Sequence, residues 1–440
     1  MKIVIVHNTY QQPGGEDIVF RNECELLKSA GHEVVEYQRS NLDAANYVSV
    51  RQLALAKRTI WASDTRREFR QLLLRERPHI VHVHNTFVMV SPSIYWACRD
   101  AQVPVVQTLH NYRLLCPAAQ FFRDGKVCEE CLEHSVWRGV QYGCYQGSSR
   151  ATAVVAAMLT THRFLGTWSR LIEYFFALTE FARLKFIQGG LPPDKILVKP
   201  NFVDPDPGEG NGNRTYALFV GRLSPEKGLW TLLAAWARLG NTIPLQIVGD
   251  GPLRAELEEY ARQHGLSNVR FRGRLAWKET MDVMKGARCL IFPSECYEGA
   301  LPLTVVEAFA CGTPVIASRL GAMQDLIADG ATGLHFTPGD SKDLASKVEH
   351  AWTHPSDLDA MRKRGRRTYE ATYTAERNYA MLLETYERAI RNYGARRESV
   401  ATDRLNPAWR MESQPEQLHA ASGYRPKLTP HGTAPGNQDL

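Results

Sequence analysis

The sequence lacks any uninterrupted apolar run of the length needed to cross a membrane, which is about 18 residues. It also lacks a recognisable leader, because residues 1–10 (MKIVIVHNTY) become polar after a few positions and are typical of a first β-strand. We therefore expect a protein of the cytoplasm.

Cysteine and net charge are also scarce. Nine cysteines in 440 residues are too few for the disulfide scaffold of a small secreted protein. The net charge of +6 is modest: it suits an anionic small ligand or an acidic membrane surface and gives no reason to expect nucleic acid as a partner. The length exceeds that of a single core and predicts about two to three domains.

Short β-branched runs alternate with amphipathic helical patterns, as is typical of parallel sheets with crossover helices. A first series of expected strands covers residues 2–7, 32–38, 79–84, 103–110, 174–180 and 195–201. After a linker rich in proline, glycine and asparagine (201–215), a second series covers residues 216–222, 244–251, 269–273, 288–294, 314–318 and 333–336. We infer the α/β class, with two doubly wound Rossmann-like domains facing each other across a ligand cleft.

These patterns divide the chain into four segments. Residues 1–203 are expected to form the first domain, with a cysteine-rich insertion at 111–147, and residues 204–368 the second domain. A charged helical pattern at 369–395 predicts a helix that packs back on the first domain. Residues 396–440 are polar, contain proline and lack periodicity, so we expect a disordered tail.

Two cations mark the end of one expected strand in the second domain. Arg222 and Lys227 lie in the segment FVGRLSPEKG (219–228), where a strand ends and a helix is expected to open near Pro225. Two cations beside a helix start form a good seat for a diphosphate. The alternative is a solvated arginine and lysine on a loop.

Two glutamates follow in the segment CYEGALPLTVVEAFACGTPVIAS (296–318), where a helix is expected from Leu303. Glu307 stands in a mostly apolar run, and an unpaired carboxylate there is costly. A carboxylate one turn into the helix would repel phosphate but can bind a vicinal diol such as that of ribose. Glu298, on the preceding loop, can do the same for a transferred sugar. The alternative places Glu307 on a partly exposed helix face and Glu298 on a solvated loop.

Taken together, the motifs GRLSPEKG (221–228), IVGDGP (247–252), FPSECYEG (292–299) and PLTVVEAFACGTPVIAS (302–318) resemble glycosyltransferase family 4, whose members are retaining enzymes of the GT-B fold. The segments VHNTYQQPGGED (6–17) and VVQTLHNYRLLCP (105–117) resemble the acceptor-side motifs of that family. The resemblance covers roughly residues 1–393.

The resemblance implies roles for individual residues. A glycine-rich loop that approaches the donor diphosphate matches Gly14 and Gly15, and a histidine that contacts the transferred sugar matches His110. The diphosphate clamp and the paired glutamates match the residues discussed above, so His110 and Glu298 are the expected catalytic residues. The same motifs place further residues at the substrate: Glu16, Arg222, Lys227, Gly249, Gly251, Arg274, Gly299, Pro302, Leu303, Thr304 and Glu307.

One departure from the family concerns the spacing of the glutamates. The family usually places seven residues between them, whereas eight separate Glu298 from Glu307. Glu307 keeps its place relative to the motif EAFACGTPVIAS, while Glu295 is an alternative to Glu298.

The resemblance implies a retaining glycosyltransferase that moves a sugar from a UDP- or GDP-linked donor to a hydroxyl group of a saccharide or lipid-linked acceptor. It further implies work in polysaccharide or glycolipid biosynthesis, with peripheral contact at the inner face of the plasma membrane. No cofactor is expected for catalysis. The alternatives are a sugar-nucleotide 2-epimerase of the same fold and a non-catalytic protein that binds sugar nucleotides.

Four cysteines in the insertion form a separate candidate site. Cys116, Cys128, Cys131 and Cys144 include one CxxC pair and supply the four thiolates of a tetrahedral structural zinc site. Such a metal would stabilise an insertion that buries little by itself. The alternatives are four unrelated thiols or a redox pair formed by Cys128 and Cys131.

Two further clusters have simpler interpretations. Residues 50–78 carry an excess of arginine and lysine, which favours a solvated helix face over contact with anionic lipid. His79, His82 and His84 lie on or beside an expected strand, and packing at the sheet edge is favoured over metal binding.

Overall fold

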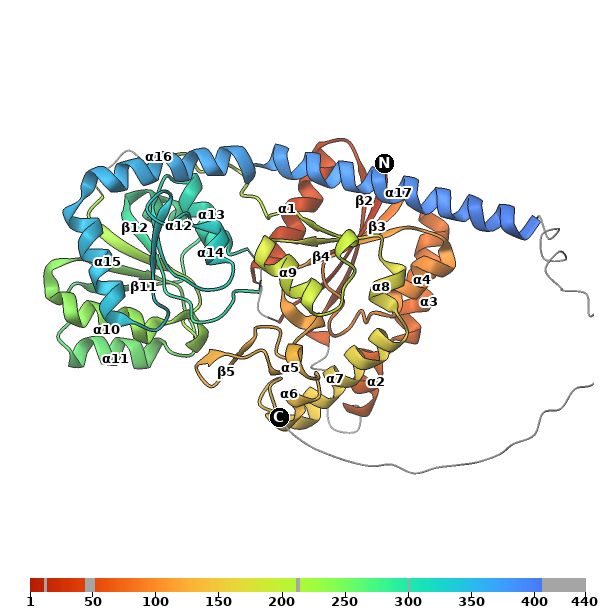
Figure 1. The fold of residues 1–440 in the computed structure, drawn as a ribbon, viewed down its shortest axis with the longest axis horizontal. Helices are drawn as coiled ribbons and strands as arrows, with labels where there is room; N and C mark the ends of the chain where they lie inside the picture. Colours follow the sequence, from red (N-terminus) through yellow and green to blue (C-terminus); the bar gives the residue numbers. More distant parts are fainter. Residues whose placement is uncertain (12–13, 44–51, 211–213, 300, 406–440) are drawn as a thin grey trace, which may run out of the picture. The chain divides into compact units, whose positions relative to one another are not determined.

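A computed structural model describes residues 1–11, 14–43, 52–210, 214–299 and 301–405 (Figure 1). Residues 1–393 form one compact unit, to which the following description applies. Within the described ranges, no helix is both long enough and apolar enough to span a bilayer.

The first domain is built on a six-stranded parallel sheet with the order β2-β1-β3-β4-β7-β8 (Figure 1). The expected first series of strands is therefore confirmed. The strands are β1 (Lys2–Thr9), β2 (Glu33–Ser40), β3 (Ile80–Val83), β4 (Val105–Leu109), β7 (Tyr174–Ala177) and β8 (Ile196–Val198). The central strands β3, β4 and β7 are buried along their whole length, as expected for a parallel sheet covered on both faces.

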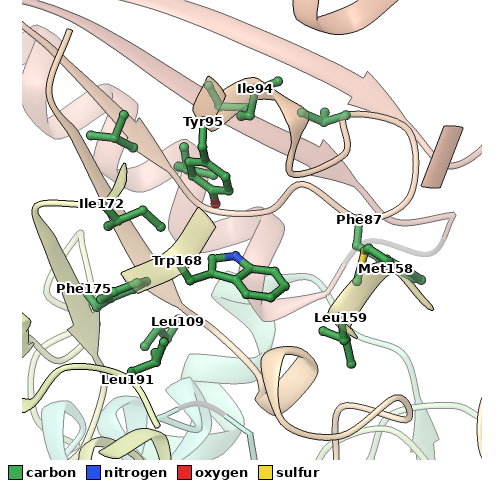
Figure 2. Packing of buried hydrophobic residues seen from close by; sticks show 14 of the residues in the cluster. Phe87, Ile94, Tyr95, Leu109, Met158, Leu159, Trp168, Ile172, Phe175 and Leu191 are labelled. Atoms are coloured by element: carbon green, nitrogen blue, oxygen red, sulfur yellow. The ribbon is translucent and has the colours of Figure 1, made fainter. Parts of the chain in front are cut away.

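Helices cover both faces of this sheet. One face packs against α3 (Ser63–Glu76), α4 (Ser93–Ala101), α7 (Ser149–Phe164) and α8 (Thr167–Leu171). Figure 2 shows part of this core, with Trp168 of α8 near Phe175, Leu109 and Met158. The opposite face packs against α1 (Gly15–Ser29), and further helices are α2 (Gln52–Ile60) and α9 (Glu180–Gln188).

The cysteine-rich insertion lies between β4 and α7. It consists of short elements, namely a 3₁₀ turn (Tyr112–Leu114), β5 (Phe122–Arg123), β6 (Lys126–Val127), α5 (Glu130–Glu133) and α6 (Arg138–Gln141). The strands β5 and β6 pair with each other and not with the main sheet.

The second domain repeats the design with the strand order β11-β10-β9-β12-β13-β14, again all parallel. Its strands confirm the second expected series: β9 (Tyr216–Val220), β10 (Leu245–Val248), β11 (Val269–Gly273), β12 (Ala287–Phe292), β13 (Val315–Ser318) and β14 (Gly333–Phe336). Its helices are α10 (Leu229–Leu239), α11 (Arg254–Gln263), α12 (Trp277–Gly286), α13 (Leu303–Ala310), α14 (Met323–Leu326) and α15 (Ser341–Thr353).

Two helices end the described chain, where the sequence predicted one at 369–395. Helix α16 (Pro355–Thr372) packs on the second domain through Leu358 and Met361. Helix α17 (Ala375–Leu405) packs on the first sheet through Leu382 and Tyr386. The helical segment is thus interrupted between Thr372 and Ala375. This interruption lets α16 and α17 each bury their own apolar side against a different core.

The expected disorder from residue 396 onward is wrong for the first ten residues of that tail. Helix α17 continues to Leu405. Residues 394–405 (GARRESVATDRL) contain alanine, arginine, glutamate and leucine, which are good helix formers and can extend a helix without apolar packing. Residues 406–440 lie outside the described residues.

Candidate active site

The start of α13 is the first part of the expected donor site. The chain leaves β12, passes through the loop that contains Glu298, and enters α13 at Leu303, as predicted. Pro302 is the N-cap residue, and its side chain accepts no capping hydrogen bond. The amides of Leu303 and Thr304 in the first turn are therefore not capped by it. Uncapped first-turn amides with the positive end of the helix dipole favour an anionic ligand.

Glu307 lies one turn further along α13 and is half-buried. Its Oε1 accepts a hydrogen bond from Nε1 of Trp277 at 2.9 Å. Burial raises the pKa of Glu307, and the bond from Trp277 acts against that rise. The sequence singled out Glu307 but missed Trp277 as its partner, although Trp277 is the first residue of α12, the helix that follows β11.

Lys227 and Glu298 are brought into direct contact. The ammonium of Lys227 lies 2.6 and 2.8 Å from the two carboxylate oxygens of Glu298, which also accepts a hydrogen bond from Ser294. The side chains are 21% and 13% exposed, so solvent screens the pair only in part. Burial lowers the pKa of Lys227, but the charge of Glu298 more than offsets this, and the pKa is raised. By contrast, Arg222 is exposed and has no ion pair within the described ranges.

The structure also separates Glu298 from its competitor. Glu295 accepts a hydrogen bond from Thr231 Oγ1 of α10 at 2.6 Å, whereas Glu298 faces Lys227. Glu298 adopts a left-handed backbone conformation with φ of 47°. That conformation is unusual for a non-glycine residue and turns the loop sharply just before the extra residue of this segment. The neighbouring Ala300 lies outside the described residues.

The helix expected to open near Pro225 begins in two steps. Residues Pro225–Lys227 form a single 3₁₀ turn, and α10 begins at Leu229. Gly228 separates the two with a left-handed φ of 66°, and a Cβ there would lie 1.9 Å from the carbonyl oxygen of Pro293. The chain must therefore kink at Gly228. Lys227 itself, rather than a helix N-terminus, supplies the positive charge at this place.

Gly249 and Gly251 have a structural role that accounts for them without a ligand. A Cβ on Gly249 would lie 1.8 Å from the carbonyl oxygen of Gly221, and one on Gly251 would lie 2.4 Å from that of Leu223. The two glycines therefore let the loops after β9 and β10 pack backbone to backbone. Arg274, after β11, is exposed.

On the first domain, the loop between β1 and α1 carries Gly14, Gly15 and Glu16. Helix α1 begins at Gly15, and the amide of Gly14 donates to Asp17 Oδ2 at 2.8 Å. Among the described residues, and leaving out its chain neighbours and the backbone of its own helix, no atom lies within 4 Å of a Cβ built on Gly15.

Glu16 connects this loop to the end of β4. Its Oε2 accepts hydrogen bonds from Tyr10 Oη and Asn111 Nδ2, both at 3.2 Å. Burial and the neighbouring charge of Asp17 raise the pKa of Glu16 to about 8. Glu16 is therefore largely protonated at neutral pH, and it lines the same cavity as His110.

His110 is 5% exposed and follows β4. It lines a cavity of about 40 Å³ together with Glu16 and Asn111. Within the part of the chain that the structure describes, four buried atoms of residues lining this cavity have no hydrogen-bond partner: His84 Nε2, His110 Nδ1, Glu16 Oε1 and Gln107 Oε1. Burial lowers the pKa of His110 well below its usual range, so the ring is neutral.

The loop with Glu298 touches the first domain near His110. A Cβ on Gly299 would lie 3.1 Å from the Cα of Asn111, so only glycine fits this approach without movement. Tyr297 packs edge to face on Phe121 and Phe181. Residues from the donor and acceptor sides of the sequence prediction therefore meet around Asn111.

The four thiols of the insertion lie near one another without disulfide bonds. Burial, and then the neighbouring thiols, raise the pKa of Cys131 to about 12. Nevertheless, no three of these sulfur atoms lie within 4.8 Å of one another in the described chain. Zinc bound at about 2.3 Å would hold them closer than this. Zinc at Cys116, Cys128, Cys131 and Cys144 stays a prediction that requires the thiols to move together.

The basic segment at 52–78 forms α2 and α3, and several of its arginines are paired. Arg58 lies 2.5 Å from Asp64, and Arg66 bonds Asp100. Such pairing favours the solvated helix face over a free cationic surface for lipid. Residues 50 and 51 lie outside the described residues.

Known families match both domains. The sequence model of Glycosyltransferase Family 4 matches residues 13–207, and that of Glycosyl transferases group 1 matches residues 204–368.

Two curated relatives match part of the chain. O-antigen chain mannosyltransferase C of Escherichia coli is 33% identical over 162 residues, which are 37% of this chain and 43% of the relative. D-rhamnosyltransferase WbpZ of Pseudomonas aeruginosa is 32% identical over 161 residues, which are 36% of this chain and 42% of the relative. The match thus spans less than half the length of these relatives.

Among solved structures, Alr3699/HepE of Anabaena in complex with UDP superposes with a TM-score of 0.64. The match covers 88% of this chain and 100% of that chain at 18% identity. At this identity the likeness shows the fold alone, which is GT-B, as the sequence predicted.

Proposed function

Because the chain belongs to the group 1 glycosyltransferases of family 4, we propose that it transfers a sugar from a nucleotide-diphospho-sugar to a hydroxyl group of a saccharide or lipid-linked acceptor, with retention of anomeric configuration. The curated relatives are named for a mannosyl and a rhamnosyl transfer, the first of them on an O-antigen chain. Synthesis of a surface polysaccharide or glycolipid is therefore the proposed setting.

The observation that carries the proposal is the pair formed by Lys227 and Glu298 beside the uncapped start of α13. Removing one partner of a half-buried pair leaves an uncompensated charge, so a ligand that separates the pair must serve both groups. A nucleotide-sugar does this, because its diphosphate suits the ammonium and its sugar hydroxyls suit the carboxylate.

In this proposal the diphosphate binds Lys227, Arg222 and the first amides of α13, and the ribose diol binds Glu307. The transferred sugar lies between Glu298 and His110. The bond from the anomeric carbon to the phosphate oxygen breaks, and the acceptor oxygen bonds the same face of that carbon. The acceptor proton passes to the departing diphosphate, whose negative charge Lys227 and Arg222 stabilise. No protein nucleophile is needed.

A sugar-nucleotide 2-epimerase is the second candidate. Such an enzyme needs acid–base carboxyl groups in the cleft, and one residue of the structure meets this need. Glu16, with a pKa of about 8 and a place in the cavity that His110 also lines, is such a group. A 2-epimerase converts its substrate without any sugar acceptor.

The test is a panel of UDP- and GDP-sugars, first ranked by thermal stabilisation. A true donor at about 100 times its dissociation constant stabilises the protein by about 2.7 kcal/mol. The ranked donors are then incubated with and without saccharide acceptors while nucleoside diphosphate release is measured. Release that rises with acceptor supports transfer; epimerised donor without acceptor supports the second candidate; binding with neither supports a non-catalytic protein.

A further inference from the structure

A row of buried polar side chains lies at the carboxyl ends of three strands of the first sheet, beside α1, and ends at His110. Lys199 follows β8, Glu23 lies on α1, His84 follows β3 and His110 follows β4. They are 1%, 0%, 3% and 5% exposed, respectively. The proposed mechanism uses His110 but none of the other three. The burial of four polar side chains needs a physical explanation, because each of them destabilises the fold when it is buried without hydrogen-bond partners.

The row begins with a fixed pair of charges. Lys199 Nζ lies 2.5 Å from Glu23 Oε1 and also donates to Asn378 Oδ1 of α17 at 3.3 Å. Burial raises the pKa of Glu23, but the charge of Lys199 and the contact with His84 more than offset this, and the pKa falls well below the usual range. Glu23 is therefore a carboxylate whose charge Lys199 already neutralises.

Metal binding does not explain the cluster. Within the described residues, Glu23, His82 and His84 are the one set of three ligand atoms close enough to share an ion. Glu23, however, already forms an ion pair with the ammonium of Lys199. Both ring nitrogens of His82 also bond hydroxyl groups, one on α17 at 2.7 Å and one on β4 at 2.8 Å. The cluster is thus a network of hydrogen bonds with its own resident cation.

The remaining contacts decide where the imidazole protons lie. Nε2 of His84 lies 3.2 Å from Oε2 of Glu23, at an angle outside that of a good hydrogen bond, and Nδ1 of His84 lies 2.9 Å from Nε2 of His110. A neutral imidazole has one N–H and one lone pair. The proton of His84 must face the carboxylate, since two lone pairs would otherwise oppose each other. Nδ1 of His84 is then the acceptor, and Nε2 of His110 is the donor.

A doubly protonated His84 would reverse this order, but the charges oppose it. Because Lys199 already neutralises Glu23, a second proton on His84 would leave a buried positive charge without an anion of its own. The nearby carboxylate of Asp17 bonds His7 at 2.9 Å instead. His84 and His110 are both neutral in this arrangement.

Nδ1 of His110 is then a lone pair without a proton. It is buried, has no hydrogen-bond partner among the described residues, and belongs to a residue that lines the cavity shared with Glu16 and Asn111. A buried acceptor left unpaired destabilises the protein by about 1–3 kcal/mol, so a donor group is expected to meet it. A hydroxyl group of the sugar ligand has the required chemistry.

We propose that His84 and Glu23 are positioning residues, which hold His110 in the Nε2–H tautomer so that its Nδ1 accepts a hydrogen bond from a sugar hydroxyl. The hydroxyl half of this inference rests on the proposed function, whereas the tautomer half does not. Glu23 acts through His84 and has no contact with substrate in this scheme.

The first experiment reads the tautomer directly in protein labelled with ¹⁵N-histidine, without any ligand. We expect the His110 signals, assigned by their loss in His110→Gln, to show a protonated Nε2 and an unprotonated Nδ1. In His84→Phe, which keeps a ring but removes both nitrogens, the His110 signals should become those of a tautomer mixture. His82→Phe is the matched control, because His82 is equally buried and is not bonded to His110. It should leave the tautomer unchanged.

The second experiment uses the best donor of the panel. Loss of one neutral hydrogen bond predicts a fall in kcat/KM of about three- to tenfold in His84→Phe relative to His82→Phe. Nucleoside diphosphate binding, measured by calorimetry, should not change. In a His110→Phe background the His84→Phe change should have no further effect on kcat/KM. Should His84→Phe unfold, Glu23→Gln combined with Lys199→Met removes the directing charge without leaving a net charge and should give the same tautomer mixture.

The outcomes separate the two levels of the account. A proton on Nδ1 of wild-type His110, or an unchanged tautomer in both the His84→Phe and the Glu23→Gln/Lys199→Met proteins, overturns the inference whatever the activity. A full effect of His84→Phe in the His110→Phe background also overturns it. The expected tautomer in a protein that transfers from no donor overturns the proposed function, and the hydroxyl half of this inference with it.

Discussion

Replacing Glu307 by glutamine perturbs the donor site at a single charge. The substitution keeps the shape of the side chain but removes the carboxylate that we assign to the ribose diol. A hydrogen bond to a charged group contributes about 1.5–3 kcal/mol, so nucleoside diphosphate affinity should fall about ten- to a hundredfold. Calorimetry with the nucleoside diphosphate and with its 2′,3′-dideoxy analogue measures this. The analogue should bind the wild type weakly and be insensitive to the substitution.

The structure adds a test through the partner of Glu307. Trp277→Phe keeps an aromatic ring but removes the N–H that holds Glu307 Oε1 at 2.9 Å, so affinity should fall about three- to tenfold. Trp230 is the matched control, because it is also 40% exposed and packs on Tyr260 of α11 instead. Trp230→Phe should leave affinity unchanged.

The same carboxylate predicts a pH dependence. Burial raises the pKa of Glu307, so acidification should protonate it at a higher pH than an ordinary carboxyl group. Wild-type affinity for the nucleoside diphosphate should therefore fall early on acidification, and Glu307→Gln should lack that step. If Glu307→Gln binds the nucleoside diphosphate as tightly as the wild type, the ribose assignment is wrong, and Glu307 serves only to bond Trp277.

Three further predictions concern other parts of the site. Lys227→Ala with Arg222→Ala should weaken donor and nucleoside diphosphate binding alike, by about tenfold or more, because both ligands carry the diphosphate; unchanged calorimetric binding removes the clamp. Protein purified without added metal should contain about one zinc per chain, and replacing Cys128 and Cys131 by serine should remove it. Metal analysis that finds no zinc, together with four thiols that are freely alkylated in the native state, would refute this. The pKa of Glu16 is raised to about 8, so its contribution to folding stability is complete below its usual pKa and is lost as the pH rises toward 8, by at most about 1.4 kcal/mol per pH unit. Denaturant titrations should therefore show that Glu16→Gln gains stability relative to the wild type between pH 5 and pH 8. A stability difference that stays constant over this range contradicts the assignment.

Much of the fold was predictable because each buried strand is a short run of β-branched residues between turn signals. The segments KIVIVH and RCLIFPS are examples, and they form the interior strands β1 and β12. The end of the chain was harder to predict. Nothing local in the charged pattern after residue 355 marks where α16 leaves one core and α17 joins another, since that break is fixed by which apolar residues meet which domain.

The site was predictable where chemistry follows a strand end, as for Lys227, Glu298 and Glu307. Their partners were not. Trp277 lies 30 residues from Glu307, and the pairing depends on how α12 packs beside α13. The contact of His84 with His110 likewise depends on the parallel register of β3 and β4, which places the two strand ends side by side. The spacing of residues along the sequence does not predict that Trp277 contacts Glu307 or that His84 contacts His110.

The central claim, sugar transfer with retention, is tested most directly by the anomeric configuration of the first product formed from an α-linked nucleotide-sugar. We predict that ¹H NMR spectra recorded during the reaction show a new α-glycosidic signal that grows together with released nucleoside diphosphate. A β-linked product would contradict retention, and conversion of the donor without any glycosidic product would contradict transfer itself.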